Sequence, residues 1–204
     1  MVVRKSIKKF ALISVYDKTN LSYLCKNLSK HNYGFISTGS TGNKIKSMGF
    51  ECLDVSKLTK VKEMFGGRVK TLNPLIYSSL LFIRDDKKHL KEFASLKFPE
   101  IDIVVVNLYP FENYYKKGKD KNLIEMIDIG GPSLLRAASK NHRYITPIIS
   151  TEDYVKLIKN LNKNGGKTDI YFRNKMALKI FKATSKYDKI ISDWLNEKKN
   201  QKKT

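Results

Sequence analysis

Residues that would point to a disulfide framework or a metal site are scarce in this sequence. Its 204 residues include only two cysteines and three histidines. Cys25 and Cys52 occur without a secretory signal, so a disulfide framework is not expected, and the thiols and imidazoles do not form a zinc-ligand spacing. We therefore expect no metal site, and we expect the two thiols to pack as small hydrophobic side chains.

Long apolar runs are also missing. No stretch reaches the roughly 20 residues that a membrane-spanning helix needs. The first nine residues, MVVRKSIKK, contain neither the hydrophobic region nor the cleavage site of a signal peptide. Hydrophobic residues still make up 41% of the chain and charged residues 29%, as in an ordinary globular protein with a core. We expect a cytoplasmic protein that makes no membrane contact.

Acidic residues are few, with 19 Asp and Glu against 40 Lys and Arg. A basic excess of this kind is typical of nucleic-acid binding, because these side chains neutralise phosphates. However, only six of the 40 are Arg, the residue whose planar fork reads guanine and phosphate. The excess also lies late in the chain, with 14 basic and 6 acidic residues in 151–204 against 7 and 5 in 101–150. We attribute it to a lysine-rich composition rather than to a nucleic-acid site.

Apolar runs of strand length alternate with amphipathic stretches. The expected strands are Phe10–Val15, Tyr33–Ser37, Phe50–Val55, Ile101–Leu108 and Ile145–Ile149. The pattern predicts an α/β fold with a mostly parallel central sheet and a helical C-terminal part from Asp153 onward, with a long helix after the diglycine at 165–166. Because no linker rich in Pro, Gly or Ser divides the chain, we expect a single domain over 1–204. Its core would span 8–196, and 197–204 would be a charged, frayed tail.

Two strand-to-helix junctions carry residues suited to an anion. Ser14 and Lys18 follow the first expected strand, and Thr38, Gly39, Ser40 and Thr41 follow the second. Hydroxyls and backbone N–H groups at a helix start can hold a phosphate, although ordinary helix caps use the same residues. Because ligands of parallel sheets gather at the carboxyl ends of the strands, the two junctions together predict a phosphate pocket.

The segment GGRVKT adds two cations and a hydroxyl to this pocket. Arg68, Lys70 and Thr71 follow a diglycine, and an extended backbone would point both cations to one side, toward one anionic ligand. A solvated basic loop is the alternative interpretation.

Later clusters supply a phenol, an acid and an amine, namely Tyr109 in NLYPF, Asp128 in IDIGGPS and Lys140 in KNH. Each has a structural alternative. Tyr109 could be a core aromatic, Asp128 could cap the helix that begins near Gly130, and Lys140 could be an exposed cation at a helix end. Their occurrence together with the phosphate pocket predicts a small-molecule reaction chamber.

Five ordered blocks resemble the IMP cyclohydrolase domain of the bifunctional purine-biosynthesis proteins that also carry AICAR transformylase. The blocks are FALISVYDKT, GGRVKTLNP, VVVNLYPFE, IDIGGPSLLRAASKNH and KATSKYDKII, and the resemblance runs from Phe10 to Trp194. It implies a three-layer fold like that of methylglyoxal synthase. The implied reaction is ring closure of formyl-AICAR ribonucleotide to IMP, without metal or cofactor. The implied partners are the nucleotide substrate, a second copy in a homodimer, and a separate AICAR transformylase, since that domain is absent here.

The resemblance also implies roles for individual residues. The phosphate would lie against Lys18, the Thr38–Thr41 turn and Arg68. The residues expected to meet the base are Lys70, Thr71, Asn107, Tyr109, Asp128, the Gly130 backbone and Lys140. Asp128 would orient or deprotonate the carboxamide with Lys140 beside it. Lys70 would stabilise the formyl oxyanion, and Tyr109 would relay protons.

Some positions depart from the family pattern. Tyr16 and Ser40 stand where the pattern has Ser and Gly near the phosphate, and Asn73 stands where it has His. Two other functions therefore remain open. One is a regulatory, anion-sensing module of the methylglyoxal synthase type, which needs the phosphate turns but not a proton-handling set. The other is a basic RNA-associated protein.

Overall fold

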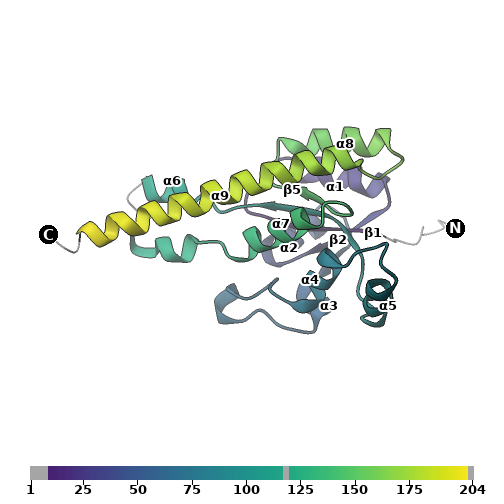
Figure 1. The fold of residues 1–204 in the computed structure, drawn as a ribbon, viewed down its shortest axis with the longest axis horizontal. Coiled ribbons are helices and arrows are strands. Elements are labelled where there is room, and N and C mark those ends of the chain that lie inside the picture. Colours follow the sequence, from purple (N-terminus) through teal and green to yellow (C-terminus); the bar gives the residue numbers. More distant parts are fainter. Residues whose placement is uncertain (1–8, 117–119, 202–204) are drawn as a thin grey trace.

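The alternating pattern folds into one parallel sheet (Figure 1). The computed structural model describes residues 9–116 and 120–201. The strands are β1 (Lys9–Val15), β2 (Tyr33–Ser37), β3 (Cys52–Asp54), β4 (Ile101–Asn107) and β5 (Thr146–Ile148), in the order β3-β2-β1-β4-β5. Every pairing is parallel, so the predicted sheet is confirmed. β3 is shorter than expected, because the Asp54 carboxylate accepts the N–H of Ser56 and starts a helix there.

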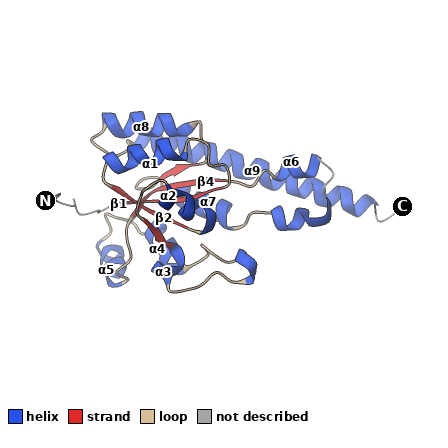
Figure 2. Ribbon diagram, turned by 180° about the vertical axis from the view of Figure 1, so that it is seen from behind, coloured by secondary structure: helices blue, strands red, loops and turns tan. Residues whose placement is uncertain are grey.

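Helices cover both faces of the sheet. They are α1 (Leu21–Lys30), α2 (Gly39–Ser47), α3 (Val55–Thr59), α4 (Pro74–Leu81), α5 (Lys87–Ser95), α6 (Phe111–Lys116), α7 (Gly130–Lys140), α8 (Asp153–Lys163) and α9 (Ile170–Gln201), with 3-10 turns η1 (Phe65–Gly67) and η2 (Asp120–Met126). Successive strand residues face opposite sides. Ile13 therefore packs with α1 and α8, whereas Leu12 packs with α4 and α7. The result is the three-layer α/β arrangement (Figure 2).

The long helix α9 joins the sheet to a third apolar cluster. It passes the edge strand β5, and it contributes Met176 to one face of the core and Ile180 to the other. Beyond the sheet it lies beside α6, where Tyr187 and Trp194 pack with Phe111 (Figure 1). The helix continues to Gln201, past the point where we expect fraying; the remaining expected tail residues, 202–204, lie outside the described part.

The cysteines behave as small core residues. Cys25 is buried, Cys52 is half-buried, and both are free thiols. Burial raises the pKa of the Cys25 thiol to about 12 and that of Cys52 to about 11, so both stay protonated near neutral pH. Across the described ranges, no helix combines the length and the apolar character needed to cross a membrane.

Candidate active site

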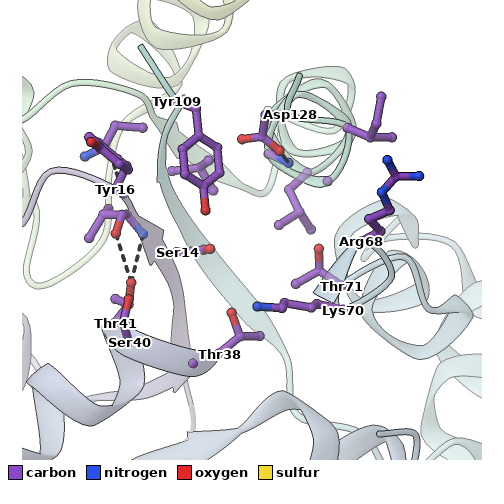
Figure 3. A pocket seen from close by; sticks show the side chains of 18 of the residues that line it. Ser14, Tyr16, Thr38, Ser40, Thr41, Arg68, Lys70, Thr71, Tyr109 and Asp128 are labelled. Atoms are coloured by element: carbon purple, nitrogen blue, oxygen red, sulfur yellow. Dashed lines mark hydrogen bonds between the residues drawn. The ribbon is translucent and has the colours of Figure 1, made fainter. Parts of the chain in front are cut away.

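A cavity of about 790 Å³ lies at the carboxyl ends of β1, β2 and β4 (Figure 3). All but one of the residues that the sequence predicts for the site line it: Ser14, Lys18, Thr38, Gly39, Ser40, Thr41, Arg68, Lys70, Thr71, Asn107, Tyr109, Asp128 and Gly130. Five separate chain segments therefore meet around one space. The exception is Lys140.

The start of α2 forms the anion-binding side of the cavity. Thr38 is the residue before the helix and makes no side-chain cap, so the first-turn N–H groups face the cavity without an intrahelical partner. Gly39 has a φ of 47°, a conformation that residues with a Cβ rarely adopt. The Thr38 side chain therefore does not form the helix cap that the alternative interpretation requires.

Two residues predicted to bind substrate instead hold the backbone of this wall. The Thr41 hydroxyl donates to the Val15 carbonyl at 3.0 Å and accepts the Val15 N–H at 3.2 Å. The Asn107 side-chain oxygen accepts the N–H groups of Tyr16 and Asp17, at 2.6 and 2.9 Å. Thr41 and Asn107 line the cavity, but these bonds occupy their side chains with positioning the β1–α1 junction.

The GGRVKT segment is a tight hairpin rather than an extended strand. Met64 and Val69 exchange backbone hydrogen bonds, and Arg68 has turn-like dihedral angles (φ −62°, ψ −28°). The two cations therefore diverge. Lys70 points toward Thr38, whereas Arg68 points away from it (Figure 3). A Cβ built on Gly39 would lie 3.9 Å from the Lys70 Nζ. The extended backbone that we expected across Arg68 and Lys70 is not present, because the chain turns at Arg68, although both cations line the cavity.

Each of these cations already has a carboxylate partner. The Arg68 guanidinium donates through two nitrogens to Glu125, with Nε 3.1 Å from Oε2. The Lys70 Nζ lies 3.2 Å from Glu63 Oε2. The hydrogen bond to Glu125 raises the pKa of Arg68, and the same bond lowers the pKa of Glu125. The sequence does not signal these partners, since Glu125 is 57 residues away from Arg68.

Asp128 serves both interpretations that the sequence leaves open. Its Oδ1 accepts the N–H of Gly131 at 2.8 Å, as a capping residue does, and its side chain lines the cavity. A Cβ at Gly131 would collide with the carboxylate, so a larger residue there would force Asp128 to move. Burial raises the pKa of Asp128, and the hydrogen bond from Gly131 opposes that rise. The carboxylate is therefore more basic than an exposed one.

Tyrosines close the cavity beside Asp128. The Tyr109 hydroxyl points into the space (Figure 3), and its ring lies 5.2 Å from the ring of Tyr16, tilted by 59°. The Tyr16 hydroxyl is 2.9 Å from the Tyr114 hydroxyl, and this hydrogen bond raises the pKa of Tyr16. Tyr16 is thus part of the wall that supports Tyr109.

Lys140 lies elsewhere. It is the last residue of α7 and is exposed, whereas Gly130 at the other end of the helix lines the cavity. Ten residues of α-helix span about 15 Å. The expectation that Lys140 stands beside Asp128 therefore does not hold within this chain. In the described residues, no group of three or more His, Cys, Asp or Glu side chains could hold a metal ion.

Comparisons with known proteins find relatives for most of the chain. Residues 20–133 match the family model described as an MGS-like domain, and residues 138–204 match the model of the AICARFT/IMPCHase bienzyme. The bifunctional purine biosynthesis protein PurH of Persephonella marina is 45% identical over 189 residues, covering 92% of this chain and 36% of its own length. PurH of Rhizobium leguminosarum is 42% identical over 190 residues, covering 93% and 35%. The chain thus spans about a third of the length of these curated relatives.

A solved structure extends the likeness to three dimensions. The crystal structure of ForH superposes with a TM-score of 0.80 at 28% identity, covering 92% of this chain and 97% of ForH.

Proposed function

The chain belongs to the MGS-like domain family, whose model matches more than half of it, and from this premise we propose that its cavity is the active site of an IMP cyclohydrolase. The reaction closes the ring of formyl-AICAR ribonucleotide to IMP with loss of water. The names of the PurH relatives and the match of 138–204 to the bienzyme model support this activity. Fold alone would not, because one fold hosts many functions.

The observation that carries the proposal is the meeting of Lys70, Tyr109 and Asp128 in one cavity. They come from three separate segments, and each supplies a different kind of proton or charge chemistry. The cavity volume, about 790 Å³, lies in the range of roughly 300–1,000 Å³ typical of small-molecule sites. A module that only binds an anion would not need an acid and a phenol beside the phosphate turn.

In the proposed ligand pose, the 5′-phosphate lies at the start of α2 with Lys18 close by. The unpaired N–H groups there favour an anion. The nucleobase then extends toward Tyr109 and Asp128 on the other side of the cavity. Lys70 stands between the two ends, since it points toward Thr38 from the hairpin (Figure 3).

In the proposed mechanism, the carboxamide nitrogen attacks the formyl carbon, forms the new C–N bond and loses a proton. Asp128 accepts that proton, a role that its raised pKa favours. Lys70 stabilises the negative charge that develops on the formyl oxygen. The formyl oxygen takes that proton through Tyr109 and a second proton from the formamide nitrogen, and it leaves as water while the C=N bond of the new ring forms. Since both reacting groups belong to one substrate, much of the rate comes from holding one rotamer.

One observation, the position of Lys140 outside the cavity, favours a second function, that of an anion-sensing module. An anion-sensing module would need the α2 turn but no complete proton-handling set. The two functions predict different results with the same nucleotide, because a sensor binds it without changing it.

The direct test is to incubate the purified protein with formyl-AICAR ribonucleotide and to follow IMP by chromatography. IMP formation well above the rate in buffer, lowered about a hundredfold in Asp128→Asn, is the expected result. Binding of IMP without any turnover would support the sensor instead. Sedimentation at several concentrations tests the homodimer that we also propose, and addition of an AICAR transformylase tests whether a separate enzyme supplies the substrate.

A further inference from the structure

Tyr187 of α9 contacts the backbone that carries Asp128. Its hydroxyl accepts the N–H of Asp128 at 2.9 Å and donates to the carbonyl of Met126 at 3.2 Å. One hydroxyl thus bridges two backbone groups on either side of Ile127. Two bonds with opposite donor roles fix both the position and the direction of this short segment.

The Tyr187 ring is itself held firmly. It is 8% exposed, and it meets Phe111 edge to face with the ring centroids 6.4 Å apart. Trp194, about two turns further along the same face of α9, belongs to the same cluster. Burial also raises the pKa of the Tyr187 hydroxyl, so the hydroxyl keeps the proton that it donates to Met126. Tyr187 is therefore a rigid support and is not among the residues that line the cavity.

The Asp128 carboxylate has little freedom of its own. Gly131 donates to it from one side, and the absence of room for a Cβ there shows how closely the two residues approach. The Gly131 N–H, at the start of α7, holds the carboxylate of Asp128. The position of the carboxylate then also depends on what holds the Asp128 backbone. The Tyr187 hydroxyl holds that backbone by accepting the Asp128 N–H.

We propose that Tyr187 is a positioning residue that sets the place of the Asp128 carboxylate in the cavity through its bonds to the backbone of Met126 and Asp128. Tyr187 touches no reacting atom. It links α9 and the third apolar cluster to the site, so the packing of that cluster bears on the chemistry. As far as turnover is concerned, this inference rests on the proposed cyclohydrolase function.

The test compares Tyr187→Phe with Tyr33→Phe. Both variants lose one buried phenol oxygen, since Tyr33 is 4% exposed and its hydroxyl donates to the Gly166 carbonyl at 3.2 Å. Tyr33 begins β2, at the end of the sheet opposite the cavity. We expect Tyr187→Phe to lower kcat about tenfold or more with KM within about twofold, because misplacing a catalytic group costs turnover first. Tyr33→Phe should lower thermal stability and leave kcat unchanged. Equal kcat values for Tyr187→Phe and wild type would overturn the proposal.

A second readout separates this proposal from the proposed function. Carbon-13 NMR of the Asp128 carboxyl follows its titration whether or not the protein turns over formyl-AICAR ribonucleotide. Loss of the Tyr187 hydroxyl should admit water and lower the Asp128 pKa toward its ordinary value, and Tyr33→Phe should not. An unchanged titration in Tyr187→Phe overturns the positioning role. If the wild type is inactive and the Asp128 titration still shifts in Tyr187→Phe, only the proposed cyclohydrolase activity is overturned.

The wild type provides a measurement if Tyr187→Phe does not fold. Hydrogen exchange of the Asp128 amide should be as slow as that of amides inside α7, because the amide donates to a buried hydroxyl. Exchange at the rate of an open loop would overturn the proposal.

Discussion

The two sides of the cavity are built in different ways. The sheet-edge wall, made of residues 14–18 and 38–41, is held by buried hydrogen bonds such as those of Thr41 to Val15. The charged wall, made of residues 63–71 and 124–131, presents cations that are held by exposed carboxylates. The side chains of Arg68 and Glu125 are 62% and 53% exposed. Exposed ion pairs are weak and are screened by salt, whereas unmaking a buried hydrogen bond is costly.

This difference separates two tasks. We expect the sheet-edge wall to change little when an anion binds, because its hydrogen bonds are buried. We expect a ligand to replace Glu63 and Glu125 as the partners of Lys70 and Arg68, because these ion pairs are exposed. We therefore expect substitutions in the charged wall to alter turnover most, and the following variants test this division.

The largest effect is expected for Lys70→Ala. Loss of the cation that stabilises the developing oxyanion should lower kcat at least about a hundredfold. Steady-state rates with formyl-AICAR ribonucleotide measure it. Lys62→Ala is the matched control, because Lys62 is exposed on the same segment and is absent from the cavity lining. A normal rate for Lys70→Ala would remove the charged wall from the chemistry.

Asp128→Asn should cost a similar factor and should also change the pH profile. Because burial raises the pKa of Asp128, the rise of kcat/KM with pH should lie above the usual aspartate range, and this limb should vanish in the variant. The free energy of unfolding changes with pH in the opposite direction to kcat/KM. The folded state holds the proton more tightly than the unfolded state, so the contribution of Asp128 to the free energy of unfolding falls as pH rises through the folded pKa. A limb at the ordinary aspartate pKa would contradict the assignment.

Glu125→Gln is expected to have a smaller effect, and it should strengthen IMP binding rather than weaken a function. Removing the counter-ion frees the Arg68 guanidinium, so IMP should bind about threefold more tightly at low salt, and the gain should shrink as salt is added. Calorimetric titration at two ionic strengths measures both. Glu92→Gln, an exposed change on α5, should leave affinity unaltered. Weaker binding in Glu125→Gln would show that Glu125 itself contacts the ligand.

Tyr16→Ser tests the boundary between the walls. Restoring the small hydroxyl of the family pattern removes the ring that packs on Tyr109 and the hydroxyl contact to Tyr114. We expect kcat to fall about fivefold, as for the loss of one aromatic contact. Tyr16→Phe keeps the ring and should lie closer to wild type. Tighter IMP binding with an undiminished kcat in Tyr16→Ser would mean that Tyr16 only obstructs the phosphate site.

The smallest effect is expected for Lys140→Ala, with kcat within about twofold of wild type. Lys140 is exposed at the far end of α7 from the cavity. The assay is the same ring closure. A hundredfold loss would show that Lys140 reaches a cavity in another way, for instance from a second copy of the chain, and mixing Lys140→Ala with Asp128→Asn subunits would then restore activity.

Local pattern predicted much of the fold. The β-branched run of Ile101–Asn107 could only be a buried strand, and the start of α9 follows the diglycine at 165–166 as expected. Element ends were less predictable, because they depend on single contacts. Asp54 ends β3 by capping α3, and α9 continues past Glu197, whose carboxylate accepts the Tyr115 hydroxyl.

The parallel α/β architecture and the chemical types in the site follow from the residue pattern, because periodicity, turn residues and the blocks around Asp128 and Lys70 are local properties of the chain. Which groups meet depends on how the chain folds back on itself. Folding brought Glu125 to Arg68 and Tyr187 to Asp128 across more than 55 residues, and it separated Lys140 from Asp128 despite their closeness in one motif. The position of a residue along a helix or a hairpin fixes the direction of its side chain. Residues that are close in the sequence can therefore face different parts of the molecule, and distant ones can meet.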